Sequence, residues 1–160
     1  MFLFNDIRGS SKTARQPKRG PTSITRCEML AITPDTRLFS SLQYAADQQG
    51  WTIRWARSLN AAMTILGCRT IPVVLYDSCG GVEDWTEAID RIKMLPDNPC
   101  VVLAAEKVNE NLWRYAIGLR AYDVVCRTGT PEELFTTLGF AWKWKTGQQS
   151  ALAEAGNAAA

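Results

Sequence analysis

Short apolar runs alternate with stretches of helical periodicity along most of the chain. Each run is four to six residues long, is rich in apolar side chains and is bounded by turn-forming residues, as buried strands are. We therefore expect five strands, which cover residues 28–32, 51–56, 71–76, 100–104 and 123–126.

Each predicted strand is followed by a segment with an apolar stripe at helical spacing. Asp35 provides an N-cap for the first of these helices, and Gly50 ends it. The stretch Thr130-Pro131-Glu132-Glu133 is a capping box with proline at the first helical position, and it predicts a fifth helix that runs through Trp144. The apolar stripes of the other helices lie at residues 38–46, 59–66, 85–92 and 112–117.

Five strand–helix units predict a doubly wound α/β fold. Strands that are apolar along nearly their whole length are typical of a parallel sheet covered by helices on both faces. Right-handed crossovers favour the flavodoxin-like (βα)5 arrangement with strand order 2-1-3-4-5. In such a sheet, functional side chains gather at the carboxyl ends of the strands, beside the switch point between the first and third strands.

The charge and composition of the ends differ from those of the middle. Residues 1–26 hold six basic residues and one acid within a chain of net charge +2, so the remainder is slightly acidic. We expect a disordered basic arm at residues 1–25, a folded domain at 26–146 and a flexible Ala/Gln-rich tail at 147–160.

Cysteine and histidine usage excludes several kinds of site. The five cysteines are isolated and the chain has no histidine, so neither a zinc site nor a disulfide framework is expected, and the thiols are predicted to be buried and reduced. No segment has the length and apolar character of a membrane span or a secretory signal, so we expect a cytoplasmic protein with no membrane partner. The spacing of Trp85 and Trp113 predicts core positions on their helices.

Asp77 and Arg127 are the chemically informative residues. Asp77 ends the third strand at a loop that contains Gly80, and Arg127 ends the fifth strand. The fold brings these strand ends near each other, where the two side chains form either a structural ion pair or a phosphate acceptor and its clamp. The spacing alone slightly favours the structural pair.

From about Cys27 to Lys145 the chain resembles the receiver domains of bacterial response regulators. The matching stretches are residues 73–77, residues 101–106 and residues 118–127. The resemblance implies that Asp77 accepts a phosphoryl group from a sensor histidine kinase or a phosphotransfer protein. It also implies that Arg127 replaces the family's lysine as the phosphate clamp, and that Mg²⁺ binds at Asp77.

The chain departs from the receiver pattern at several diagnostic positions. Thr33 and Pro34 stand where the family has two metal-binding acids, and Ala104 stands where it has a serine or threonine. Val124 replaces an aromatic residue. Asp35 is a metal ligand only if the alignment slips, and its role as a helix N-cap is the simpler interpretation. These departures indicate a degenerate receiver in which Mg²⁺ binding and phosphorylation are doubtful.

Three functions follow as hypotheses. The first is a stand-alone receiver in a phosphorelay, phosphorylated at Asp77 and acting through an unknown downstream protein. The second is a pseudo-receiver that binds partners without phosphorylation. The third is weak nucleic-acid binding by the basic arm, which is the least expected because the arm lacks aromatic residues. No independent enzyme is expected, since the chain lacks a nucleotide-binding or hydrolase motif, and Trp142-Lys143-Trp144-Lys145 is a candidate homodimer or partner surface.

Overall fold

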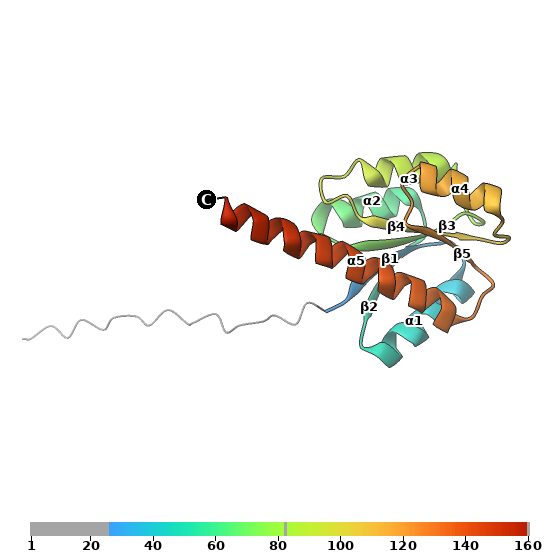
Figure 1. Ribbon diagram of the computed structural model, residues 1–160. Coiled ribbons are helices and arrows are strands. Elements are labelled where there is room, and N and C mark those ends of the chain that lie inside the picture. Colours follow the sequence, from blue (N-terminus) through green and yellow to red (C-terminus); the bar gives the residue numbers. More distant parts are fainter. Residues whose placement is uncertain (1–25, 82, 160) are drawn as a thin grey trace, which may run out of the picture.

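A computed structural model describes residues 26–81 and 83–159. The element order is strictly alternating, and Figure 1 shows the sheet between two layers of helices. The strands are β1 (Glu28–Ile32), β2 (Thr52–Ala56), β3 (Val73–Asp77), β4 (Cys100–Ala105) and β5 (Asp123–Cys126). The helices are α1 (Thr36–Gln49), α2 (Leu59–Cys68), α3 (Trp85–Lys93), α4 (Glu110–Gly118) and α5 (Pro131–Ala158).

The sheet is parallel throughout and has the order β2-β1-β3-β4-β5. This confirms the prediction of a flavodoxin-like (βα)5 fold with strand order 2-1-3-4-5. The reversal of strand order between β1 and β3 places the loops after these strands next to each other at the carboxyl edge.

Two apolar cores hold the layers together. One face of the sheet packs against α2, α3 and α4, around fully buried residues that include Leu30, Ile89 and Leu103. The other face packs against α1 and α5, around Leu42 and Phe135. Because β3 and β4 are buried along their whole length, the two cores fix the strand ends at which the candidate site is built.

The helix ends follow the predicted capping signals. Asp35 accepts hydrogen bonds from the backbone N–H groups of the first turn of α1, and Gly50 ends that helix in the left-handed conformation. Thr130 and Glu133 form the predicted capping box of α5. Figure 1 shows that α1 and α5 lie on the same side of the sheet.

Three predictions need correction. Helix α5 continues to Ala158, so the segment expected to be a flexible tail at 147–160 is helical through that residue. Trp113 was predicted to lie in the core, yet 44% of its surface is exposed and its indole N–H donates to Asp123. Cys68 and Cys79 were predicted to be buried and are exposed. All five cysteines are free, and Cys27 and Cys100 are buried as expected. The predicted arm at residues 1–25 lies outside the described residues.

Candidate functional site

Asp77 lies at the carboxyl edge of the sheet, as the last residue of β3. Its neighbour in the register of β4 is Ala104, and its side chain has no exposed surface. The loops after β1 and β5 supply its neighbours from sequence positions 44 and 50 residues away. A carboxylate without access to water needs hydrogen bonds and a nearby positive charge to remain ionised.

Both oxygens of the Asp77 carboxylate accept hydrogen bonds from the protein. The hydroxyl of Thr33 donates to Oδ2 at 2.7 Å, and the backbone N–H of Cys79 donates to Oδ1 at 3.1 Å. Arg127 donates with two nitrogens, from Nε to Oδ1 at 3.1 Å and from Nη2 to Oδ2 at 2.9 Å. This bidentate arrangement is the strongest common form of an arginine–carboxylate pair. The predicted meeting of Asp77 and Arg127 is therefore present.

Arg127 also binds a second carboxylate. Its Nη2 donates to Oδ2 of Asp35 at 2.9 Å, while Oδ1 of Asp35 accepts from the backbone N–H groups of Arg37 and Leu38. These backbone hydrogen bonds, above all the one from Arg37, and the charge of Arg127 lower the pKa of Asp35. Asp35 is thus the N-cap of α1 and a member of the site at once.

Arg127 is held as a cation by the two carboxylates. Burial lowers the pKa of its guanidinium, but the hydrogen bonds and the charge of Asp77, together with Asp35, outweigh burial, and the pKa is raised. Only 20% of the Arg127 side chain is exposed. The exposed part faces a pocket of about 230 Å³ between α1 and the start of α5, with Leu38 and Leu134 in its lining.

The loop after β3 and the turn after β1 close over Asp77. A Cβ atom placed on Gly80 would lie 2.3 Å from Cγ and 2.5 Å from Cδ of Pro34, so the proline ring lies directly against this glycine. The same Cβ position is 3.7 Å from Oδ2 of Asp77, which places the Pro34–Gly80 contact next to the carboxylate. Glycine is required here because any larger residue would displace the ring.

Thr33 is held in place by an aromatic residue that sequence reasoning did not connect to the site. The indole N–H of Trp55 donates to the carbonyl of Thr33 at 2.8 Å. Trp55 stacks on Phe39 with ring centroids 4.5 Å apart, and Arg57 lies over its ring. The signal in the sequence was weak, since Trp55 only marks the end of a strand whose carboxyl edge joins the switch point.

The residues at this edge do not fit a divalent metal ion. Within residues 26–81 and 83–159, no group of three or more His, Cys, Asp or Glu side chains gathers in a way that could hold one. The Arg127 guanidinium lies between the carboxylates of Asp35 and Asp77, and donors of the protein already occupy the carboxylate oxygens that Mg²⁺ would need. Thr33 and Pro34, which stand where the receiver family has two metal-binding acids, have other roles here, since Thr33 donates a hydrogen bond to Asp77 and Pro34 packs on Gly80.

Ala104 and Val124, two of the departures from the receiver pattern, are both buried. Ala104 is fully buried beside Asp77 and has no hydroxyl. The nearby hydroxyl of Ser78 donates to the carbonyl of Ala104 at 2.9 Å, which fixes the start of the loop after β3. Val124 is buried in the core that contains α4.

Solved structures that share this architecture include receiver domains and response regulators. The chemotaxis response regulator CheY4 of Vibrio cholerae is 14% identical, with a TM-score of 0.67 over 72% of this chain and 98% of that one. A response regulator from Thermotoga maritima is 19% identical, with a TM-score of 0.67 over 74% and 98%. This chain has the response-regulator receiver fold.

A third structure extends the likeness further along the chain. The signal receiver domain of an HD domain-containing protein from Pseudomonas fluorescens Pf-5 is 19% identical, with a TM-score of 0.71 over 82% of this chain and 98% of that one. No protein-family model and no curated protein matches the sequence. At these identities the likeness establishes the receiver fold, and the chemistry has to be argued from the site itself.

No helix within the described residues is long and apolar enough to cross a membrane.

Proposed function

We propose that this chain is a signalling module with the receiver fold whose partner binding does not depend on phosphorylation of Asp77. One observation carries the proposal. The Asp77 carboxylate is fully buried and has a bidentate hydrogen bond from Arg127, which itself bridges to Asp35. Output then depends on the surface of the fold, through contacts with another protein, and no independent enzymatic activity is proposed.

The argument against phosphorylation is chemical. Attack on a phosphoryl group requires an exposed carboxylate oxygen, an in-line approach and cations that neutralise the developing charge. Here the oxygens of Asp77 accept from Thr33, Cys79 and Arg127, and the Pro34–Gly80 contact lies next to Oδ2. Exposing the carboxylate means separating a buried ion pair, which costs about 3–5 kcal/mol when one partner is lost.

A working receiver in a phosphorelay is the second candidate. The pocket of about 230 Å³ beside Arg127 offers space into which the guanidinium could turn, with Asp35 still in reach at its rim. In that case a sensor histidine kinase or a phosphotransfer protein would be the donor, and Mg²⁺ would have to enter where Arg127 now lies. Nucleic-acid binding by the arm and a cytoplasmic location stay predictions from the sequence.

The test is incubation with acetyl phosphate and Mg²⁺, followed by intact-mass measurement. We expect no phosphoryl increment on the wild-type chain and no Mg²⁺-dependent change in tryptophan fluorescence, which Trp55 would report from its contact with Thr33. An increment that disappears in Asp77→Asn would overturn the proposal and favour the phosphorelay. Failure with acetyl phosphate but transfer from a histidine kinase would overturn it equally.

A designed double variant tests whether closure of the site by Arg127 and Pro34 is the reason that Asp77 is not phosphorylated. The pair Pro34→Asp and Arg127→Lys introduces an acid beside Asp35 and a shorter cation at the same edge. If closure by Arg127 and Pro34 is the cause, the double variant gains a phosphoryl increment that the wild type lacks, and Asp77→Asn in that background removes it. An unreactive double variant that still folds would mean that closure alone does not explain the inactivity.

A further inference from the structure

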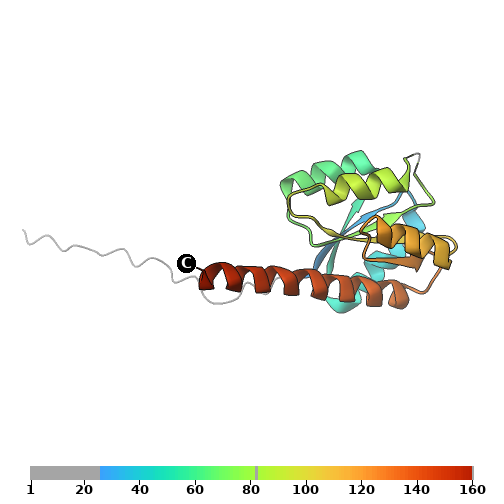
Figure 2. The ribbon, with the colours of Figure 1, turned by 45° about the horizontal axis from the view of Figure 1, so that its top comes forward.

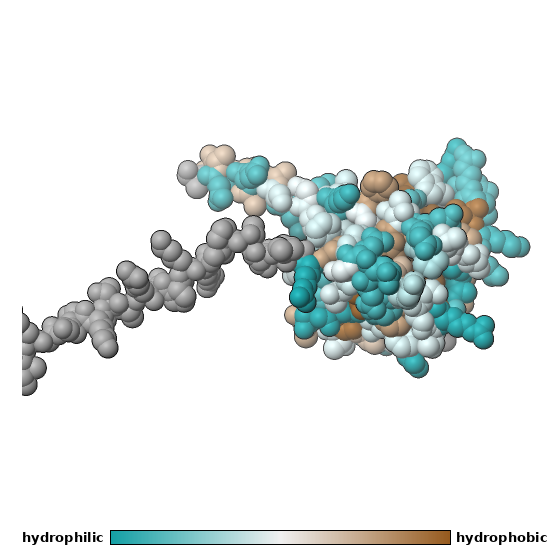
Figure 3. Space-filling view, turned by 90° about the horizontal axis from the view of Figure 1, so that it is seen from below, coloured by the Kyte–Doolittle hydropathy of each residue, from teal (hydrophilic) through white to brown (hydrophobic). Residues whose placement is uncertain are grey.

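Helix α5 runs from the carboxyl edge of the sheet to the amino edge and continues past it. The helix starts soon after β5, and its last buried residue is Ala141, whereas it ends at Ala158. Figure 2 shows the red end of α5 pointing away from the sheet, and in the space-filling view this far half of the helix stands clear of the body (Figure 3). The amino edge, where the parallel strands begin, is therefore flanked by α5.

Lys93 lies at the amino end of β4. It is the last residue of α3, and its Nζ donates to the carbonyl of Pro99, directly before β4, at 3.0 Å. Arg120, in the turn between α4 and β5, donates from Nη2 to the carbonyl of Lys93 at 3.5 Å. Two cations from different elements therefore meet at this end of the strand.

A third cation approaches from the other face of the sheet. Burial lowers the pKa of Lys93, and the charges of Lys145 and Arg120 lower it further, against the opposite effect of Cys100. Burial raises the pKa of the Cys100 thiol to about 11, although Lys93 and Lys145 act to lower it. Lys145 belongs to α5, so the three cations come from both helical layers and surround the start of β4.

These three cations form no ion pair in the part of the chain that the structure describes. None of the salt bridges there includes any of them. Asp97 accepts from the hydroxyl of Thr70, and Asp123 accepts from the indole N–H of Trp113. Like charges that gather without a counter-charge repel one another, and a bound anion removes this repulsion.

Arg120 has a backbone conformation that favours glycine. Its φ is 68°, in the left-handed region, and the N–H of Ala121 donates to the carbonyl of Ala116 at 3.0 Å. This is the position after a helix that glycine usually occupies, and a larger side chain is unfavourable there. A charged residue at a position that disfavours it indicates that the charge has a role.

Trp144 lies beside the three cations. It is 48% exposed, and its ring centroid is 5.6 Å from that of Tyr122. The backbone N–H of Tyr122 donates to the carbonyl of Val101 at 2.7 Å, so the aromatic pair lies next to the start of β4. Proteins that bind single-stranded nucleic acid combine cations for the phosphates with exposed aromatic rings on which bases stack.

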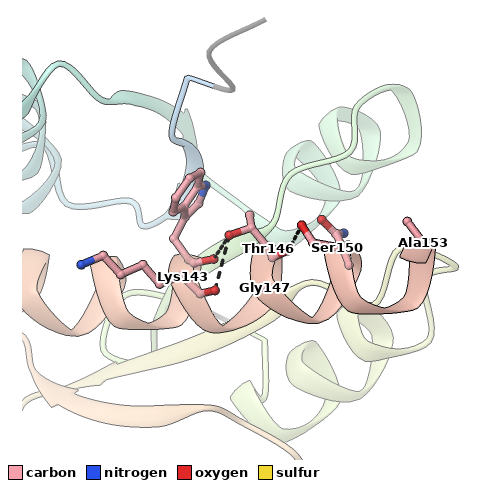
Figure 4. Close-up of a pocket in the computed structure, with 7 residues that line it drawn as sticks. Lys143, Thr146, Gly147, Ser150 and Ala153 are labelled. Carbon is pink, nitrogen blue, oxygen red and sulfur yellow. Dashed lines mark hydrogen bonds between the residues drawn. The ribbon is translucent and has the colours of Figure 1, made fainter. Parts of the chain in front are cut away.

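The most basic segment of the chain joins the body at the same edge. Residues 1–26 hold six basic residues and one acid and lead into β1, which only β3 separates from β4. On the far half of α5, two lysines and no acid lie between Ala141 and Glu154. A depression of about 600 Å³ follows this part of the helix, and Lys143 is the one charged residue in its lining (Figure 4). Positive charge therefore continues on both sides of the cluster.

We propose that the amino edge of the sheet binds single-stranded nucleic acid, with Lys93, Arg120 and Lys145 at its phosphates and Trp144 stacked on a base. Trp144 provides the stacking group that the basic residues of the arm lack. Binding through phosphates is sensitive to salt and is largely independent of sequence. The site lies at the opposite edge of the sheet from Asp77, so this inference is independent of the proposed function.

Fluorescence anisotropy of the full chain with a labelled single-stranded oligonucleotide of mixed sequence tests the cations. Lys145→Gln and Arg120→Gly should each weaken binding about fivefold, and each should reduce the slope of log affinity against log salt concentration by about 0.7. Arg120→Gly should also raise the thermal stability, because glycine suits the left-handed conformation. A purely structural arginine would not combine these two effects. Lys107→Gln, on the loop before α4, is the matched charge change and should leave the affinity unchanged.

Trp144→Ala supplies an independent test of stacking. It should weaken binding about fivefold or more without changing the salt dependence, and Trp144→Phe should keep part of the affinity. Tyr44→Ala removes a more exposed aromatic ring, on α1, and should have no effect.

Three outcomes would overturn the proposal. The first is a wild-type chain that does not bind the oligonucleotide. The second is binding that the variants at Arg120, Trp144 and Lys145 weaken no more than the controls do, because the arm or another surface then holds the strand. The third is binding to phosphatidylserine vesicles without binding to the oligonucleotide, which would identify the edge as a membrane contact.

Discussion

The carboxyl edge of the sheet and the far half of α5 differ in how their charged side chains are paired. At the edge, the carboxylates of Asp35 and Asp77 bind the same guanidinium of Arg127, and Asp77 is completely enclosed. Along α5, Lys143 and Glu154 are exposed and have no salt-bridge partner among the described residues. One region is chemically complete within the monomer, and the other is not.

This difference bears on where a signal can act. A ligand shifts a conformational equilibrium only through a difference in its interaction energy with the two states. Arg127 already supplies the positive charge beside Asp77. A ligand at the carboxyl edge of the sheet can therefore gain little binding energy from changing the conformation there. The outer surface, with its unpaired charges and exposed aromatic residues, is the region that retains capacity for new contacts.

The largest expected effect comes from removing the central cation. Arg127→Met leaves Asp77 buried without its counter-charge and should lower the free energy of unfolding by about 3–5 kcal/mol. Arg114→Met removes an arginine from an exposed pair with Glu110 and should cost no more than about 0.5 kcal/mol. Urea denaturation of both variants measures the contrast. Equal changes would show that the pair at the sheet edge is no more important than a surface pair.

A smaller effect is expected from the hydroxyl of Thr33. Thr33→Val keeps the shape of the side chain but removes the donor to Asp77, which should cost about 1.5–3 kcal/mol because a charged acceptor loses a buried bond. Thr70→Val removes a hydroxyl that donates to Asp97 at 3.1 Å on the exposed surface, and should change stability by about 0.5 kcal/mol or less. Urea denaturation measures the loss in both variants. Equal losses would contradict the enclosure of the Asp77 carboxylate.

Closure of the site by Pro34 predicts an effect of steric origin. Gly80→Ala forces the proline ring to move and should cost toward the lower end of about 1–3 kcal/mol, since the turn after β1 is partly exposed and can shift. Pro34→Ala in the same chain should recover much of this loss. Gly67→Ala has no such neighbour and should instead stabilise α2 by about 0.5–1 kcal/mol. Thermal unfolding of the wild type, Gly80→Ala, Pro34→Ala and the double variant forms the cycle that decides it, with Gly67→Ala as the control.

The smallest effect concerns the pH dependence contributed by Asp35. Its pKa in the folded chain is lowered below the ordinary value of 3.8, so its contribution to stability is complete above that value and is lost as the pH falls through the lowered pKa. We expect the loss of stability on acidification below about pH 4 to be shallower in Asp35→Asn than in the wild type. Denaturation at neutral and acid pH measures both slopes, and parallel slopes would contradict the assignment.

The fold could be predicted because its signals are local and agree with one another. The runs around Leu75 and Val102 are apolar on both faces, which only a covered parallel sheet accommodates, and capping residues such as Asp35 and Thr130 marked the helix starts. The end of α5 was missed because apolar periodicity reports packing against a core. Beyond Trp144 the helix has no core to pack on, yet Ala, Gln and Glu favour helix intrinsically.

The site was predicted only in part. Topology places the ends of β3 and β5 at the same edge of the sheet, on either side of β4, and the long Arg127 side chain reaches Asp77 from there, as expected. The shared use of Arg127 by Asp35 and Asp77 was not foreseen, because it depends on side-chain reach across 92 residues of sequence. The support of Thr33 by Trp55 and the contact of Pro34 with Gly80 are likewise packing results that no periodicity encodes.

The sharing of Arg127 by two acids has a consequence for how such a site can evolve. Replacing Arg127 first leaves Asp77 enclosed beside Asp35 with reduced positive charge between them. Replacing Pro34 by an acid first adds a third carboxylate beside a single cation. Either order passes through a chain that is less stable than its parent, so the substitutions are strongly epistatic. The closed edge therefore resists single substitutions at either position and changes its chemistry only by paired substitutions.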